Sequence, residues 1–131
     1  MKLRIRGNSI RLRLGESEIA QLMKRGRVSE SIQFSAFPGS RLTYTVVTSP
    51  DAKEITARLR DSEIEVTVPE GLGQGWANSE QVGLNHVQPI DNEVNLSILI
   101  EKDFRCLEPR PGEDQSDTFT NPAQGKPCNH P

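Results

Sequence analysis

Hydrophobic and polar residues alternate with a period of two through the first fourteen positions of the chain. A two-residue turn at Gly7-Asn8 predicts a β-hairpin in which Leu3 faces Leu12 and Ile5 faces Ile10 on one side. The other side then carries a basic face made of Lys2, Arg4, Arg6, Arg11 and Arg13. Like charges directly opposite each other destabilise a sheet. The pattern therefore predicts an anion-binding face, whose anion comes either from this chain or from a ligand.

The period changes to that of an amphipathic helix after this hairpin. Gly15 suits the N-cap, Glu18 suits the third helical position, and Gly26 suits the residue after the helix. We expect one short helix over residues 16–25, with one apolar face formed by Ile19, Leu22 and Met23.

Four consecutive segments then return to a period of two. Their apolar positions are Ile32 and Phe34; Leu42, Tyr44 and Val46; Ile55, Ala57 and Leu59; and Ile64, Val66 and Val68. Turn residues separate them at 37–40, 49–51 and 61–62, which predicts an antiparallel meander. A loop is expected over residues 69–79, followed by a short strand at 81–87 and a longer one at 94–101.

One helix cannot cover seven or eight strands that are each apolar on one side. We therefore expect a mainly β (α+β) fold, an antiparallel meander curled into a barrel or half-barrel with the aliphatic side chains inside. The alternative is that the apolar faces of two copies of the chain pack together, in which case the protein would be a homodimer.

A length of 131 residues fits one domain. We expect a β-rich domain over residues 1–107 and an extended or disordered, acidic and proline-rich tail over 108–131. The N-terminus resembles neither a signal peptide nor a membrane span, and two cysteines fit a reducing compartment, so the expected location is the cytoplasm.

Charge is unevenly distributed along the chain. Residues 1–60 hold 12 Lys or Arg against 5 Asp or Glu, whereas residues 61–131 hold 4 against 13. The predicted hairpin at 54–68 neutralises itself, because Arg58 faces Glu65 and Arg60 faces Glu63. These glutamates are thus engaged locally, and counter-ions for Arg4 and Arg11 must come from elsewhere. Arg41, Arg58 and Arg60 are expected on strands next to the basic face.

Metal binding is a second candidate chemistry. Sulfur and imidazole ligands from Cys106, Cys128 and His130 would suit zinc. Their spacing matches no standard zinc finger, so ordinary cysteines or a single disulfide remain the alternatives, and no cofactor is the primary expectation.

Two further motifs give little support for catalysis. The glycines of Gly71-x-Gly73-x-Gly75 resemble a phosphate loop, but neither a lysine nor a recognisable helix follows. The only histidines, His86 and His130, neighbour no recognisable nucleophile motif. The alternating charges also resemble the triphosphate-tunnel enzymes, but those open with Glu-x-Glu-x-Lys, whereas this chain opens with Lys-x-Arg-x-Arg.

Three segments together resemble a family of small bacterial proteins of unknown function: residues 4–14, residues 76–83 and residues 101–107. The acidic residues 113–114 and the segment 117–122 are also similar to the end of that family. The resemblance covers nearly the whole chain and implies a single bacterial domain. It implies no catalytic residue, because no activity is attached to the family.

The sequence thus favours a non-enzymatic domain that binds a small anion or a protein partner through its basic face. A metal-dependent or phosphate-handling enzyme is the alternative. Nucleic acid is a less suitable partner, because the basic strands lack aromatic residues on which bases could stack.

Overall fold

The computed structural model of the chain describes residues 1–104, which form eight strands and two helices. In chain order these are β1 (Lys2–Arg6), β2 (Ser9–Leu14), α1 (Glu16–Arg25), β3 (Arg27–Gln33), β4 (Arg41–Ser49), β5 (Thr56–Arg60), β6 (Glu63–Pro69), α2 (Glu70–Ala77), β7 (Gly83–Pro89) and β8 (Asn95–Lys102). The strands are those that the period-two pattern predicts, with shifts of a few residues at their ends.

The strands form two sheets, and neither is a meander. Sheet A has the order β1-β2-β8-β7, and sheet B has the order β3-β4-β6-β5. Each sheet joins two antiparallel hairpins through a parallel central pair, β2 with β8 and β4 with β6. The predicted meander is wrong because the segment after β4 carries the chain to the sheet edge, where β5 forms before β6 returns to the centre.

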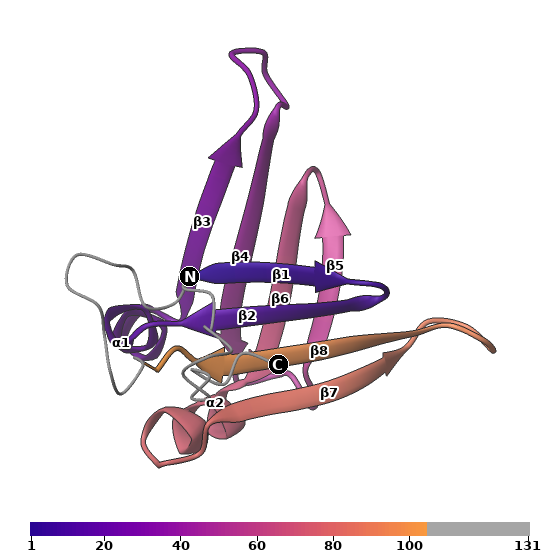
Figure 1. Cartoon of the computed structure of the whole chain (residues 1–131). Coiled ribbons are helices and arrows are strands. Elements are labelled where there is room, and N and C mark those ends of the chain that lie inside the picture. The colour runs from indigo at the N-terminus through magenta and orange to yellow at the C-terminus, as the bar shows by residue number, and fades with distance from the viewer. Residues whose placement is uncertain (105–131) are drawn as a thin grey trace, which may run out of the picture.

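The two sheets cross at a steep angle and face each other (Figure 1). Their inner faces carry the aliphatic rows that form the core, among them Leu12, Leu14, Val46, Val66 and Ile100. Because each sheet buries the apolar face of the other, neither has to curl. The predicted barrel or half-barrel is therefore wrong, whereas a mainly β fold with aliphatic residues inside is confirmed.

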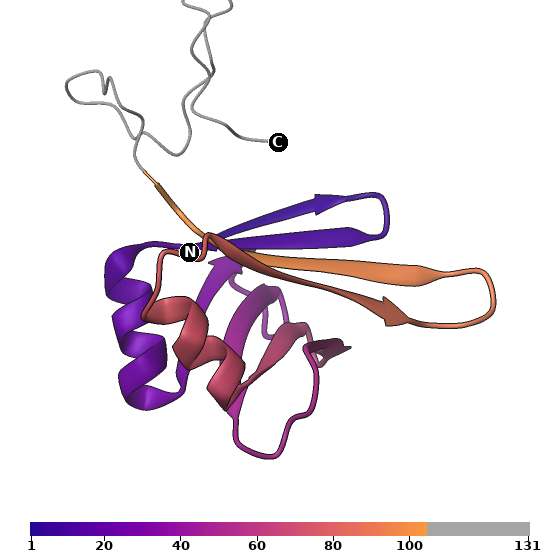
Figure 2. The ribbon, with the colours of Figure 1, turned by 90° about the horizontal axis from the view of Figure 1, so that it is seen from below.

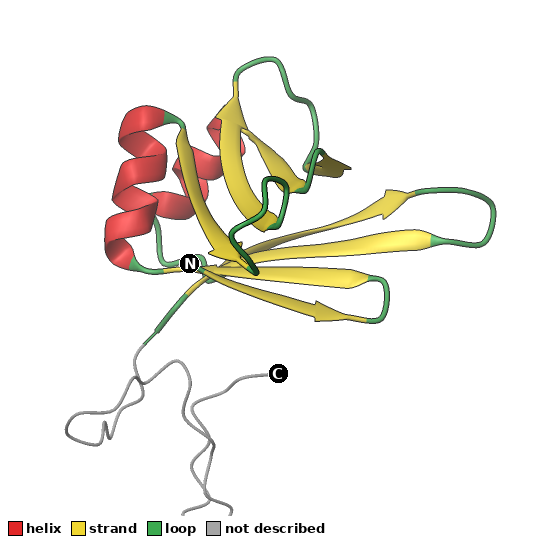
Figure 3. Cartoon of the chain, turned by 90° about the horizontal axis from the view of Figure 1, so that it is seen from above, coloured by secondary structure: helices red, strands yellow, loops and turns green. Residues whose placement is uncertain are grey.

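Both helices lie at one end of this sandwich, where the sheets converge (Figures 2 and 3). The bounds and caps of α1 are confirmed: the Gly15 amide donates to Glu18 Oε1 at 2.8 Å, and Gly26 adopts a left-handed φ of 74°. Helix α2 replaces the predicted loop. It buries Trp76, whose indole N–H donates to the Val82 carbonyl oxygen at 3.0 Å.

The topology repeats itself as two units, each a hairpin, a helix and a second hairpin. An offset of 54 residues relates β1, β2 and the start of α1 to β5, β6 and the start of α2. The same residue occurs at four pairs of equivalent positions: Arg4 and Arg58, Arg6 and Arg60, Ile10 and Ile64, Glu16 and Glu70. The first hairpin of one unit shares a sheet with the second hairpin of the other. Every position of the basic face therefore has an equivalent in sheet B.

Candidate anion-binding face

The predicted register of the first hairpin is confirmed. Lys2 lies opposite Arg13, Arg4 opposite Arg11, and Arg6 opposite Ser9. The alternation of strand residues places all five cations of the basic face on the outer side of sheet A, away from the core. Two cationic rows therefore face each other along β1 and β2.

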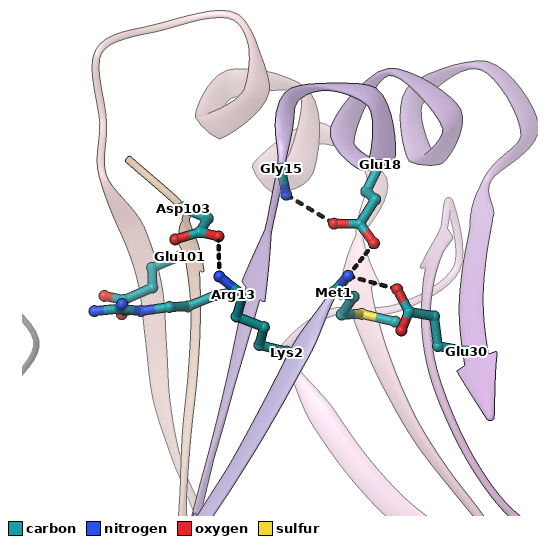
Figure 4. Close-up of polar contacts among 8 residues, drawn as sticks. All are labelled: Met1, Lys2, Arg13, Gly15, Glu18, Glu30, Glu101 and Asp103. Carbon is teal, nitrogen blue, oxygen red and sulfur yellow. Dashed lines mark hydrogen bonds and ion pairs between the residues drawn. The ribbon is translucent and has the colours of Figure 1, made fainter. Parts of the chain in front are cut away.

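The chain itself supplies carboxylates to part of this face (Figure 4). Glu101 lies on β8 beside Arg13 in the parallel register, and its Oε1 is 2.7 Å from Arg13 Nε and 3.4 Å from Arg11 Nε. Asp103 Oδ2 is 2.7 Å from Lys2 Nζ. The side chains of Arg11, Arg13 and Glu101 are only 15%, 13% and 12% exposed. Acidic residues of the chain itself therefore serve as counter-ions for Lys2, Arg11 and Arg13.

The remaining two cations lie on the edge strand. Arg4 and Arg6 are exposed on β1, and they extend the face beyond the Glu101 cluster. Within residues 1–104, Glu101 and Asp103 contact three of the cations of the face, namely Lys2, Arg11 and Arg13. Guanidinium groups on a rigid hairpin can bind phosphate or carboxylate oxygens in a bidentate manner.

The equivalent hairpin of sheet B is arranged differently. Arg58 donates to Glu65 at 2.9 Å, and Arg27 contacts Glu63 at 3.0 Å and Glu65 at 3.6 Å. Glu65 occupies the position that Arg11 occupies in the first repeat. The predicted self-neutralisation of this hairpin is confirmed for the Arg58–Glu65 pair. In the β5–β6 hairpin of sheet B, arginines of one strand therefore face glutamates of the other, whereas in the β1–β2 hairpin of sheet A both strands carry positive side chains.

Three other arginines do not extend the basic face. Arg41, Arg58 and Arg60 belong to β4 and β5, so they lie on sheet B, and the expectation that they flank the basic face is wrong. Arg41 donates to Gln33 on the neighbouring strand at 3.0 Å. The pairing of hairpins across the two sheets separates these residues from the first hairpin.

Sequence reasoning missed a charged corner at the N-terminus. The ammonium group of Met1 contacts Glu18 of α1 and, at 2.5 Å, Glu30 of β3, and Tyr44 Oη donates to Glu30 at 3.3 Å (Figure 4). Burial alone would favour the neutral forms of the Met1 amine and the Glu30 carboxyl group. The hydrogen bonds and charges between the groups outweigh it, raising the pKa of the Met1 amine and lowering the pKa of Glu30. Burial and the Glu30 charge raise the pKa of Tyr44. The corner ties β1 to α1 and β3.

The other candidate chemistries receive no support from the structure. The proposed zinc ligands Cys106, Cys128 and His130, and the tail 108–131, lie outside the described residues. No group of three metal-binding side chains occurs within residues 1–104. Gly71, Gly73 and Gly75 lie inside α2 and form no phosphate loop. In this same part of the chain, neither helix has the length and apolar character that a membrane crossing requires.

Comparison with known sequences identifies a family. The sequence model of a family described as a family of unknown function (DUF7009) matches residues 1–123, which include both repeats. No curated protein and no solved structure matches the chain. The resemblance to a family of unknown function is thus confirmed at the family level, and a bacterial source stays a prediction.

Proposed function

The chain belongs to this family of unknown function, and we propose that it is a binding domain whose basic face recognises a phosphate or carboxylate group of a partner. The observation that supports the proposal is the opposition of like charges along β1 and β2, Arg4 against Arg11 and Lys2 against Arg13. Such pairs are unfavourable in a sheet unless anions lie between or above them. Glu101 and Asp103 show that carboxylate groups fit on this face, beside Arg13 and Lys2.

Two exposed arginines on β1 are accessible to an anion of a partner. Arg4 and Arg6 project from alternate positions of the same strand, so one ligand can contact both guanidinium groups. The hairpin is held by β8 on one side, which keeps the two side chains on a rigid base. Bidentate, charge-assisted hydrogen bonds from arginine are stronger than neutral ones, and they select planar or tetrahedral oxyanions.

Calorimetric titration with inorganic pyrophosphate tests the proposal. The double variant Arg4→Ser/Arg6→Ser removes the two edge-strand cations, and Arg58→Ser/Arg60→Ser removes the equivalent two from sheet B with the same change in net charge. We expect the first variant to bind pyrophosphate at least about fivefold more weakly than the unmodified protein, and the second to stay within about twofold.

Equal weakening in both variants would show that only net charge matters, and no weakening in either would place the anion elsewhere. Both results would overturn the proposal. Affinity should also fall as ionic strength rises, because exposed charges are screened.

A further inference from the structure

We propose further that the two repeats of the chain are complementary binding partners, so that the domain is a dimer of a basic unit and an acidic unit joined by one linker. The first repeat comprises residues 1–53 and the second comprises residues 54–104, and the segment 50–55 connects β4 to β5. This inference does not depend on the proposed function, because it concerns how the two halves of the chain recognise each other.

The pairing of the strands has two-fold symmetry. Strand β2 pairs in parallel with β8, so that Leu12 lies opposite Ile100, and β4 pairs in parallel with β6, so that Val46 lies opposite Val66. Each residue of one parallel pair lies 54 positions from its equivalent in the other. The same offset relates the register of β1 with β2 to that of β5 with β6. Two-fold symmetry of this kind is typical of a dimer of two similar chains.

The contacts that complete each sheet run between the repeats. The two hairpins of one repeat belong to different sheets, and each parallel pair joins a hairpin of the first repeat to a hairpin of the second (Figure 1). The side chains at these junctions are fully buried, among them Leu12, Val46, Val66 and Ile100. An isolated two-stranded hairpin is at best marginally stable in water. Each repeat therefore needs the other to complete both sheets and to bury its apolar residues.

The two repeats carry opposite net charges. Residues 1–53 hold 10 Lys or Arg against 4 Asp or Glu, whereas residues 54–104 hold 3 against 10. Opposite charges on two surfaces favour their association and disfavour contact between two copies of either one. The uneven distribution of charge along the sequence is thus what two complementary partners require.

Ion pairs across the junction of sheet A have one polarity. The cations Lys2, Arg11 and Arg13 belong to the first repeat, and the carboxylates of Glu101 and Asp103 that contact them belong to the second (Figure 4). Because Arg11, Arg13 and Glu101 are mostly buried, their contacts are screened less by solvent than surface ion pairs are. These pairs therefore hold the first repeat to the second.

The junction of sheet B has the same polarity. Arg27 of the first repeat lies 3.0 Å from Glu63 Oε2 and 3.6 Å from Glu65 Oε2 of the second. The fully buried Thr45 of the first repeat donates from Oγ1 to Glu63 Oε2 at 2.6 Å. In both sheets, acidic side chains of the second repeat thus bind polar or cationic side chains of the first.

Two copies of one repeat would fit less well. In a pair of first repeats, Val47 would stand at the position of Glu101, so Arg13 would lose this counter-ion. In a pair of second repeats, Glu65 would stand at the position of Arg11 and would approach Glu101 instead. Like charges on neighbouring strands are unfavourable. The charges therefore select the pairing of unlike repeats.

The test cuts the linker in the full chain. A protease recognition sequence is inserted between Lys53 and Glu54, which are both exposed, because exposed loops tolerate insertions best. After cleavage the two pieces should elute together at the volume of the uncut variant, and native mass spectrometry should find one copy of each. The melting temperature of the cut protein should fall by roughly 6 °C for each tenfold dilution, whereas that of the uncut variant should stay constant.

Variants of the cut protein test the role of charge, with the fluorescence of the buried Trp76 followed on dilution. Glu101→Gln/Asp103→Asn removes the two carboxylates at the junction of sheet A and should raise the dissociation constant of the two pieces at least about tenfold. Glu80→Gln/Glu93→Gln removes two exposed carboxylates of the second repeat and should change this constant by less than about twofold.

Separation of the pieces at micromolar concentration, or loss of the fold on insertion or cleavage, would show that the linker is required and would overturn the proposal. Complexes of two like pieces, or equal effects of the two double variants, would show that charge does not select the partner, and they would overturn the complementarity of the repeats.

Discussion

Replacing Glu101 by glutamine tests whether the carboxylate on β8 holds the two inner arginines of the basic face. The substitution keeps the shape of the side chain but removes its charge. Glu101 Oε1 is 2.7 Å from Arg13 Nε and 3.4 Å from Arg11 Nε, and all three side chains are mostly buried. The variant therefore leaves two largely desolvated guanidinium groups without this counter-ion.

The expected loss is about 2 kcal/mol in the free energy of unfolding. A hydrogen bond to a charged group contributes roughly 1.5–3 kcal/mol. Breaking a fully buried ion pair costs roughly 3–5 kcal/mol, and this upper range must be reduced here because each side chain keeps some contact with solvent. For a domain of this size, such a loss lowers the melting temperature by roughly 8 °C.

Glu65→Gln is the matched control. Glu65 also contacts two arginines, Arg27 at 3.6 Å and Arg58 at 2.9 Å, but these cations are 51% and 60% exposed. Exposed ion pairs contribute roughly 0–1 kcal/mol, so this variant should lose well under 1 kcal/mol.

Urea unfolding followed by fluorescence of the buried Trp76 measures both losses. Pyrophosphate should also raise the melting temperature of Glu101→Gln more than that of the unmodified protein, because the anion replaces the missing carboxylate. If Glu101→Gln is no less stable than Glu65→Gln, the account of the inner arginines is wrong.

Three further predictions concern the rest of the fold. The pKa of the Met1 amine is raised, so the charged amine stabilises the fold fully below its ordinary pKa of 8.0, and this stabilisation is lost as pH rises through the raised pKa. The pKa of Glu30 is lowered, so its carboxylate stabilises the fold above the ordinary pKa of 4.5, and this stabilisation is lost as pH falls through the lowered pKa. Urea unfolding should therefore show highest stability between these limits, and Glu30→Gln should flatten both slopes. Gln88→Leu should cost about 2 kcal/mol, because it leaves the Ala57 amide and carbonyl groups unpaired, whereas the exposed Gln81→Leu should cost little. Ser62→Gly should stabilise the protein by about 0.5 kcal/mol in the same assay, since Ser62 has a left-handed φ of 62°.

Local features of the fold were predictable from the sequence because they depend on neighbouring residues. The register of the first hairpin follows from its alternation and its Gly7-Asn8 turn. The bounds of α1 follow from Gly15, Glu18 and Gly26, which satisfy the free backbone groups at its ends. These signals act within a few positions along the chain.

The assembly of hairpins was not predictable in the same way. An alternating pattern shows which face of a strand is apolar, but it does not show what covers that face. The pairing of β4 with β6 and the packing of one sheet on the other therefore could not be predicted from the alternation. Helix α2 escaped because three glycines lower its intrinsic helix propensity, and it is stabilised instead by the burial of Trp76. The repeat with an offset of 54 residues is weak in the sequence, because few equivalent positions, such as Arg4 and Arg58, hold the same residue.

The candidate site was predictable only in its cations. Their common face follows from the alternation of β1 and β2. The carboxylates that contact them are far away in sequence: Glu101 is 88 positions from Arg13, and Asp103 is 101 positions from Lys2. Only the parallel pairing of β2 with β8 brings Glu101 beside Arg13.

The measurement that tests the central claim most directly is an NMR titration of the arginine Nε–H signals with pyrophosphate. If the basic face binds the anion, the signals of Arg4 and Arg6 should shift with a common dissociation constant, while those of Arg58 and Arg60 on sheet B stay in place. Equal shifts on both sheets, or shifts confined to sheet B, would contradict the account.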